Sequence, residues 1–189
     1  MAIVLASASP RRRELLAQIG CGFTVVTSDI IEDNTQDIPP EQLVILQAKI
    51  KAQSVAAVVD RHDIVIGADT IVVLDGQVYG KPKDTHDAKC MLFSLSGREH
   101  KVITGIAVVT RDILLTDYEV TTVKMAELTA EDIQRYVISG EPMDKAGAYA
   151  IQGKGAVFIE RIDGCYSNVV GMPLRKLAKL LAKVGVSVP

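Results

Sequence analysis

The sequence IVIGADTIVVL occupies residues 64–74, and all of its side chains except Asp69 and Thr70 are apolar or glycine. β-Branched residues in an uninterrupted apolar run favour a strand that is buried on both faces. We therefore predict a central strand over residues 63–70. Residues 71–79 predict a hairpin that turns at Asp75-Gly76, because Asp-Gly is a preferred turn pair between apolar strands.

On the N-terminal side of this strand, the signals for strand and helix alternate. Ser9 followed by Pro10 marks a helix start, since Ser is a favoured N-cap and Pro is favoured at the first helical position. Gly20 marks the end of that helix. The expected elements are a strand at residues 3–6, a helix from Ser9 to about residue 19, a strand at 23–27, an acidic loop at 28–40 and a helix at 41–59.

On the C-terminal side, strands and helices again follow one another. Thr129 and Asp132 form a capping-box pattern in which Asp takes the place of the usual Glu. The expected elements are a helix at 85–95, antiparallel strands at 100–109 and 113–125 that turn at Arg111-Asp112, a helix at 129–139, a Gly- and Ala-rich segment at 140–155, a strand at 156–162 and a helix at 173–184. The mixture of parallel and antiparallel signals predicts an α/β or α+β fold with a mixed sheet.

The size and charge of the chain narrow its function. With 189 residues it suits one domain, or two small lobes that share a cleft. Its composition, 48% hydrophobic and 23% charged, argues against a disordered chain. Lys and Arg number 21 against 23 Asp and Glu, so the basic footprint of a nucleic-acid binder is missing and no nucleic-acid partner is expected. A small anionic substrate is compatible with this charge.

Neither a membrane nor a zinc site is expected. The longest apolar stretches, such as residues 64–74, are too short to cross a bilayer, and no signal peptide is visible, so a cytoplasmic location is expected. The three histidines form no metal-binding cluster. The three cysteines have spacings that suit neither a zinc site nor a disulfide framework, and we interpret them as core residues: Cys21, Cys90 and Cys165.

Two charged residues stand where packing alone would not place them. Asp69 interrupts an apolar run, and an ionised group is costly to bury without a partner. It is either a functional carboxylate, which we favour, or an aspartate that caps a backbone amide. Lys51 emerges from an apolar arc of the helix at 41–59. It is either a functional cation or a lysine that reaches solvent past its own stem.

The segment SASPRR at residues 7–12 places two hydroxyl and two guanidinium groups where a strand passes into a helix. A helix N-terminus offers free backbone amides, and arginine matches phosphate oxygens, so Ser7, Ser9, Arg11 and Arg12 are candidate ligands for a triphosphate. The alternative is a capped surface helix with solvated arginines.

Other motifs are incomplete or ambiguous. Residues 76–82 approximate a phosphate loop, but their glycines are one residue too close and Pro82 stands where Ser or Thr would bind magnesium. Gly153-Lys154-Gly155 lacks the third glycine of a dinucleotide fingerprint. In the acidic loop, Glu32 and Asp33 carry oxygens that suit Mg²⁺ shared with substrate phosphates, although acidic loop residues are commonly just solvated.

Together these segments resemble the Maf family of nucleoside triphosphate pyrophosphatases over essentially the whole chain. The resemblance rests on SASPRR at 7–12, Glu32, Ala48-x-x-Lys51-Ala52, GADT at 67–70, GKP at 80–82, LSG at 95–97, GEPMDKAGAYAIQG at 140–153 and YSNVVGMP at 166–173. It implies that residues 1–189 form a single Maf-like domain. The implied fold is a two-lobed α/β structure with an elongated mixed β-sheet flanked by helices, an active-site cleft between the lobes and, often, a homodimer.

The resemblance also implies an activity. The family hydrolyses the α–β phosphoanhydride of a nucleoside triphosphate with a divalent cation, Mg²⁺ or Mn²⁺, and the AIQG ending looks like the branch that acts on dTTP and UTP. Asp69 matches the family's proton acceptor, which activates water. Asp69 and Glu32 also match the family's metal ligands. The matching reaction centre is completed by Glu32, Lys51 and Lys81, and the positions that set substrate choice are matched by Arg11, Thr70 and Gln152.

The chemistry of the residues agrees with these roles, but it does not decide how the metal is bound. The Gln152 amide has a donor and an acceptor, which fits the edge of a pyrimidine. Members of the family often carry a second acidic residue before the glutamate, whereas here Ile31 precedes Glu32 and Asp33 follows it, so the metal ligands and the number of ions stay open. The alternative function is a non-catalytic, nucleotide-responsive regulator of septum formation and cell division. The full set of candidate catalytic residues favours the enzyme.

Overall fold

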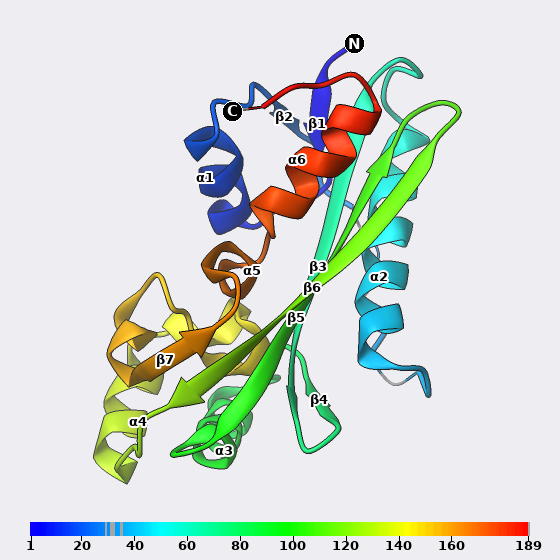
Figure 1. The fold of residues 1–189 in the computed structure, drawn as a ribbon. Helices are drawn as coiled ribbons and strands as arrows, with labels where there is room; N and C mark the ends of the chain where they lie inside the picture. Colours follow the sequence, from blue (N-terminus) through cyan, green and yellow to red (C-terminus); the bar gives the residue numbers. More distant parts are fainter. Residues whose placement is uncertain (29, 31–32, 35, 189) are drawn as a thin grey trace. The chain divides into compact units, whose positions relative to one another are not determined.

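A computed structural model describes residues 1–28, 30, 33–34 and 36–188. Its strands are β1 (Ile3–Leu5), β2 (Thr24–Val25), β3 (Ile64–Leu74), β4 (Gln77–Tyr79), β5 (Glu99–Val109), β6 (Leu114–Met125) and β7 (Ile159–Asp163). The α-helices are α1 (Pro10–Gln18), α2 (Pro40–Ala56), α3 (Thr85–Leu95), α4 (Ala130–Ile138), α5 (Tyr166–Val170) and α6 (Leu174–Lys183), and the 3₁₀ helices are η1 (Glu141–Asp144), η2 (Ala146–Ala148) and η3 (Lys154–Phe158) (Figure 1).

Within the described residues, the seven strands form one mixed sheet, as the sequence predicted. The order is β2-β1-β3-β5-β6-β7, with β4 pairing with β3 outside this path. β1 is parallel to both of its neighbours, whereas β4 and β7 are antiparallel to theirs. The buried strand predicted at 63–70 therefore lies inside the sheet as the first part of β3.

The hairpin between β3 and β4 turns where the Asp-Gly pair predicted it. Leu74 pairs with Gln77, and the two turn residues Asp75 and Gly76 have φ angles of 51° and 80°. Two consecutive residues with positive φ define the tight turn that matches the twist of paired strands. This turn fixes the register of β4 on β3.

The chain packs as two compact units. The first comprises residues 1–69, 104–119 and the chain from 171 onward, and the second comprises residues 70–103 and 120–170. The strands β3, β5 and β6 each contribute residues to both units. Asp69 is the residue at which the chain first passes from the first unit to the second.

In the first unit, α2 lies very close to β3. Ala48 and Ala52 are fully buried on the face of α2 that packs against the small apolar residues of the sheet. Gly67 makes this approach possible, because a Cβ atom there would lie 2.3 Å from the Ala48 carbonyl oxygen. Small residues on both elements thus set the distance between helix and strand.

The second unit has its own apolar core, made by α3, α4 and the adjoining parts of the sheet. Leu92 and Ile133 are among its buried residues. The capping box predicted for α4 is confirmed: the Thr129 hydroxyl accepts from the Asp132 amide at 3.1 Å, and the Asp132 carboxylate accepts from the Thr129 amide at 3.1 Å. Aspartate therefore serves in place of the usual glutamate.

The boundaries of some elements differ from the prediction. The strand expected at 23–27 is limited to Thr24–Val25, and the strand expected at 156–162 begins only at Ile159 because residues 154–158 form η3. The short helix α5 was not predicted, since five residues give too little periodicity to recognise. Ser9 occupies the N-cap position of α1, but its side chain makes no capping hydrogen bond.

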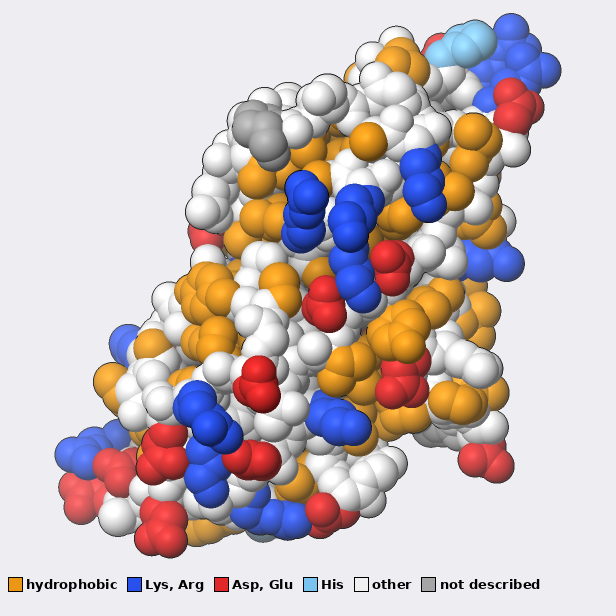
Figure 2. All heavy atoms as spheres, in the orientation of Figure 1, with side chains coloured by type: hydrophobic (Ala, Val, Ile, Leu, Met, Phe, Trp, Pro, Cys, Tyr) orange, Lys and Arg blue, Asp and Glu red, His pale blue; other side chains and the backbone are white. Residues whose placement is uncertain are grey.

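The C-terminal helix α6 is amphipathic. Leu177, Leu180 and Leu181 are buried, while the basic residues of LRKLAKLLAK lie on its other face. Figure 2 shows Lys and Arg side chains gathered where Figure 1 places α6. On this helix, Lys176 contacts the carboxylates of Asp117 and Glu119. Across the described residues, no helix combines the length and the apolar character needed to span a membrane.

Candidate active site

The two charged residues singled out by the sequence form a buried ion pair in the first unit. Lys51 Nζ lies 2.5 Å from Asp69 Oδ1, and the two residues are only 7% and 2% exposed. Lys51 therefore does not reach solvent past its own stem, which excludes that interpretation. This bond engages Oδ1 of the carboxylate, and Oδ2 is a second oxygen of the kind that can accept a proton or bind a cation.

The geometry of α2 explains why a lysine is buried there. Lys51 shares a helical face with Ala48, Ala52 and Val55, which are all buried against the sheet. The small alanines bring the helix axis close to β3, and the longer lysine on the same face then reaches the carboxylate of Asp69. An isolated ion at this depth would be costly, so each charge depends on the other.

The SASPRR segment follows β1, which is parallel to β3 and ends beside Ile66, three residues before Asp69. In the parallel register of β1 and β3, Leu5 pairs with Ile66, and the Ala6 amide donates to the Ile66 carbonyl at 2.8 Å. The chain leaves the sheet at this point and enters α1, as expected for a binding site at the carboxyl end of a parallel strand.

Hydrogen bonds hold the segment in a fixed turn. The buried Ser7 hydroxyl oxygen accepts from Arg12 Nη1 and from the Ser9 amide, both at 3.2 Å. Arg12 Nε donates to the Gly171 carbonyl at 2.9 Å. Arg11 and Arg12 are both half-buried. The segment thus places two guanidinium groups at the start of α1, where Pro10 has no backbone N–H and the first helical amides are those of Arg11 and Arg12. Guanidinium groups and helix N-terminal amides are groups that can bind phosphate.

The acidic loop is attached to α2 by contacts that the sequence did not indicate. The side-chain amide of Gln47 donates to the Asp33 carbonyl at 2.9 Å, and the Ser28 and Ser54 hydroxyl groups are 2.8 Å apart. Gln47 is 2% exposed. Gln47 could have been recognised from the sequence as a polar amide on the buried face of a helix. Glu32, predicted as a catalytic residue and metal ligand, lies outside the described residues.

The predicted residues of the second unit are Lys81 and Gln152, which are exposed, and Thr70, which is half-buried. The Gly147 amide donates to the Gly80 carbonyl at 3.0 Å. This bond joins the loop that carries Lys81 to the Gly- and Ala-rich segment that carries Gln152. The loop that carries a predicted catalytic residue is therefore joined to the segment that carries a predicted substrate-binding residue.

A buried polar pair lies in the second unit. His100 Nε2 and the Tyr149 hydroxyl are 2.8 Å apart, and the two rings meet edge to face at 5.4 Å. Burial lowers the pKa of His100 from 6.5 to about 4 and raises the pKa of Tyr149. Both side chains are therefore neutral at pH 7, and they link β5 to the segment that precedes Gln152.

The carboxylate of Asp69 is a suitable oxygen ligand for Mg²⁺. The part of the chain that the structure describes contains no group of three His, Cys, Asp or Glu side chains that could hold a metal ion. Mg²⁺ commonly binds through one or two carboxylates and completes its shell with water and substrate phosphates. A magnesium site with only one or two protein carboxylates is therefore compatible with the carboxylate that Asp69 supplies.

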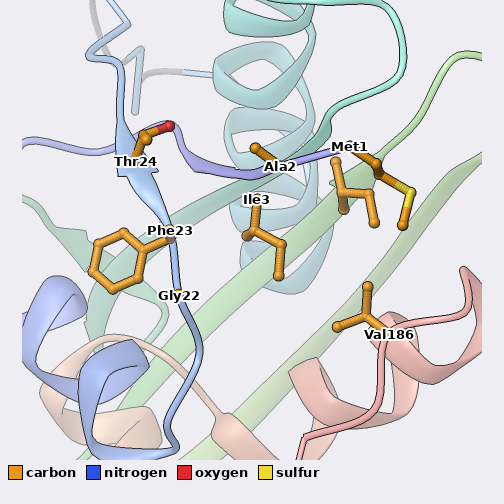
Figure 3. Close-up of a pocket in the computed structure, with 8 residues that line it drawn as sticks. Met1, Ala2, Ile3, Gly22, Phe23, Thr24 and Val186 are labelled. Carbon is orange, nitrogen blue, oxygen red and sulfur yellow. The ribbon is translucent and has the colours of Figure 1, made fainter.

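A cavity of about 380 Å³ lies elsewhere in the first unit. Figure 3 shows its lining of mainly apolar side chains from the N-terminal residues and the segment before β2. The lining residues are Met1, Ala2, Ile3, Gly22, Phe23, Thr24, Ile64 and Val186. It contains none of the predicted site residues and no charged side chain, so it is not the site described above.

A mixed β-sheet flanked by helices defines the class of fold. The fold is similar to that of the HAM1 protein from Coxiella burnetii, with a TM-score of 0.54 and 18% identity, covering 96% of this chain and 98% of that one. It is also similar to the Staphylococcus aureus Ham1 protein, with a TM-score of 0.52, 16% identity and the same coverage of 96% and 98%.

The sequence identifies the family within this class. Residues 2–184 match the Maf-like protein family, and the chain belongs to it. A dTTP/UTP pyrophosphatase from Acetivibrio thermocellus is 53% identical over 194 residues, covering 98% of this chain and 96% of that protein. A dTTP/UTP pyrophosphatase from Alkaliphilus metalliredigens is 48% identical over 183 residues, covering 96% of this chain and 95% of that protein. The resemblance of the sequence to the Maf family is therefore confirmed.

Proposed function

We propose that this protein is a nucleoside triphosphate pyrophosphatase that hydrolyses dTTP and UTP to the nucleoside monophosphate and pyrophosphate. The observation that carries the proposal is the buried ion pair of Lys51 and Asp69. Asp69 lies on β3, and β3 pairs with β1, the strand that leads into the SASPRR turn. The names of the relatives, which match over nearly the full length of the chain, support the same activity.

Asp69 is the proposed proton acceptor. In the reaction, the oxygen of a water molecule bonds to the α-phosphorus, the bond from that phosphorus to the α–β bridging oxygen breaks, and pyrophosphate leaves with the electron pair. The proton lost by the water passes to Asp69 Oδ2, since Oδ1 already accepts from Lys51. Lys51 holds the carboxylate in one orientation. The attraction between the two opposite charges also offsets part of the free energy needed to bury them.

The phosphates are proposed to bind at the start of α1. Arg11 and Arg12 would neutralise the phosphate oxygens, and the Ser7 and Ser9 side chains and the first amides of the helix would donate to them. The bond from Arg12 to Ser7 supports this proposal, because it holds the guanidinium group in one orientation. An ordered donor loses little conformational freedom on binding, and so favours both affinity and alignment.

In the second unit, Lys81 is proposed to complete the reaction centre, and Thr70 and Gln152 are proposed to bind the substrate and set its choice. The exposed amide of Gln152 can pair with the carbonyl and the N–H on the edge of thymine or uracil. A single amide cannot separate these two bases, because they differ by one methyl group, which is worth about 1 kcal/mol. The proposal therefore includes both dTTP and UTP as substrates.

A divalent cation, Mg²⁺ or Mn²⁺, is proposed as the cofactor, with Asp69 and Glu32 as its ligands. When bound, such an ion supplies positive charge to the phosphates of the substrate. The homodimer that the resemblance implies stays a prediction. So do the cytoplasmic location expected from the sequence and the absence of nucleic-acid and membrane partners.

Product analysis tests the proposal. Purified protein with Mg²⁺ is incubated separately with dTTP, UTP, CTP, GTP, ATP and 7-methyl-GTP, and the products are separated by ion-exchange chromatography. We expect monophosphate and pyrophosphate from dTTP and UTP. Diphosphate and phosphate would refute the site of cleavage, and preferential cleavage of 7-methyl-GTP would refute the choice of base. Tight nucleotide binding without any product would favour the regulator instead.

A further inference from the structure

The loop that carries Gln152 is tied at both ends to two polar side chains. At its start, the Ala150 amide donates to the Tyr136 hydroxyl oxygen at 3.1 Å. At its end, the amides of Lys154 and Gly155 donate to the Glu141 carboxylate at 3.0 and 3.2 Å. The Tyr136 hydroxyl in turn donates to Glu141 Oε1 at 2.8 Å, which joins the two anchors. Residues 150–155 are therefore held by one connected network.

The two glycines of the loop are explained by this network. A Cβ atom on Gly153 would lie 2.4 Å from Glu141 Oε2, and one on Gly155 would lie 2.8 Å from the Tyr136 hydroxyl oxygen. Neither position has room for a side chain while the carboxylate and the hydroxyl group stay in place. The Gly-Lys-Gly motif, which suits no dinucleotide fingerprint, is instead shaped to receive Glu141 and Tyr136.

The network is anchored in the core of the second unit. Tyr136 is 5% exposed, and its ring meets Phe158 edge to face at 5.0 Å. Burial by itself would raise the pKa of Glu141, but the bonds from the Lys154 amide, the Tyr136 hydroxyl and the Gly155 amide outweigh it and lower the pKa. The carboxylate is thus charged at neutral pH, and charged acceptors make the stronger hydrogen bonds.

We propose that Glu141 is a positioning residue which, through residues 150–155, holds Gln152 in the orientation that reads the nucleobase. This inference rests on the proposed function, because Gln152 can select a base only if the protein binds a nucleotide. Glu141 does not touch the substrate in this account. It fixes the backbone on one side of Gln152, while Tyr136 fixes the backbone on the other side.

A purely stabilising role for Glu141 predicts a different outcome. If the carboxylate only strengthened the fold, its loss would lower the thermal stability and change the rates with all nucleotides by the same factor. A positioning role predicts a selective loss, because the misplaced amide of Gln152 matters only for the base that it recognises. The ratio of kcat/KM for UTP to kcat/KM for GTP separates these two cases.

The test is a double-mutant cycle of Glu141→Gln, Gln152→Ala and the double variant. Glu131→Gln is the matched control, since Glu131 lies in the same unit with a side chain that is 77% exposed. We expect Glu141→Gln to lower the UTP/GTP ratio about tenfold, as the loss of a hydrogen bond to a charged group implies. The double variant is expected to show no further loss in this ratio. Tyr136→Phe is expected to act in the same direction.

The outcomes separate this inference from the proposed function. If the wild type yields no monophosphate and pyrophosphate, the proposed function fails and the positioning role fails with it. If the wild type is active and the losses of the two single variants simply multiply in the double variant, the proposed function stands and the positioning role is wrong. An active Glu141→Gln protein with an unchanged UTP/GTP ratio would also overturn it. Amide hydrogen exchange at residues 151–153 provides a second readout: it is expected to accelerate in Glu141→Gln and not in Glu131→Gln.

Discussion

The buried ion pair gives the sharpest prediction for stability. Replacing Lys51 by Met removes the ammonium group that lies 2.5 Å from Asp69 and leaves a carboxylate that is 2% exposed without its counter-charge. At this distance the direct attraction is about 7 kcal/mol for an effective dielectric constant of about 20. Part of that attraction offsets the cost of burying both ions, so the net loss for a broken buried pair is about 3–5 kcal/mol.

Urea unfolding followed by circular dichroism measures this loss as a fall in the free energy of unfolding. Lys49→Met is the matched control, because Lys49 lies on the same helix and is only half-buried; its effect is expected to stay within about 0.5 kcal/mol. The double variant Lys51→Met with Asp69→Leu is expected to be more stable than Lys51→Met alone, because it buries no unpaired charge. Equal stabilities of the single and double variants would refute the reasoning.

Two further predictions concern packing and pH. Gly67→Ala is expected to destabilise the protein by about 3 kcal/mol, because its Cβ atom would lie 2.3 Å from a carbonyl oxygen of α2; Gly22→Ala, with nothing within 4 Å of its Cβ atom, is the control for the same urea experiment. Burial lowers the pKa of His100 from 6.5 to about 4, so the unfolded chain takes up this proton first as the pH falls. The contribution of His100 is therefore complete above about pH 6.5 and decreases by about 3 kcal/mol towards pH 4. A His100→Gln variant is expected to lose less stability than the wild type over that interval, and equal losses would contradict the prediction.

Local chemistry made much of the fold predictable. The Asp-Gly turn, the capping box of α4 and the bounds of α3 depend on residues that are neighbours in the sequence, and all three were predicted correctly. The late start of β7 was not predictable in this way. It depends on η3, whose first two amides are bound by Glu141, and that residue lies 13 positions before Lys154.

The candidate site was predictable as separate residues but not as an arrangement. Asp69 and Lys51 each stood out because a charged residue interrupts an apolar pattern. Their contact depends on how closely α2 approaches β3, which is set by Gly67 and the small side chains of the helix. The hydrogen bond from the Gln47 side chain to the Asp33 carbonyl was not predictable from a motif, because any residue could supply that backbone carbonyl.

The central claim is that Asp69 accepts the proton of the attacking water, and Asp69→Asn tests it most directly. Asparagine keeps the shape and the acceptor for Lys51 but has little basicity. The measurement is kcat for UTP hydrolysis, with binding of a non-hydrolysable UTP analogue measured on the same folded protein and Asp112→Asn, an exposed aspartate in a turn, as the control. We predict that kcat falls by about 10²–10⁴-fold while the analogue still binds, as expected for the loss of a general base. An Asp69→Asn protein that turns over UTP at the rate of the wild type would contradict the account.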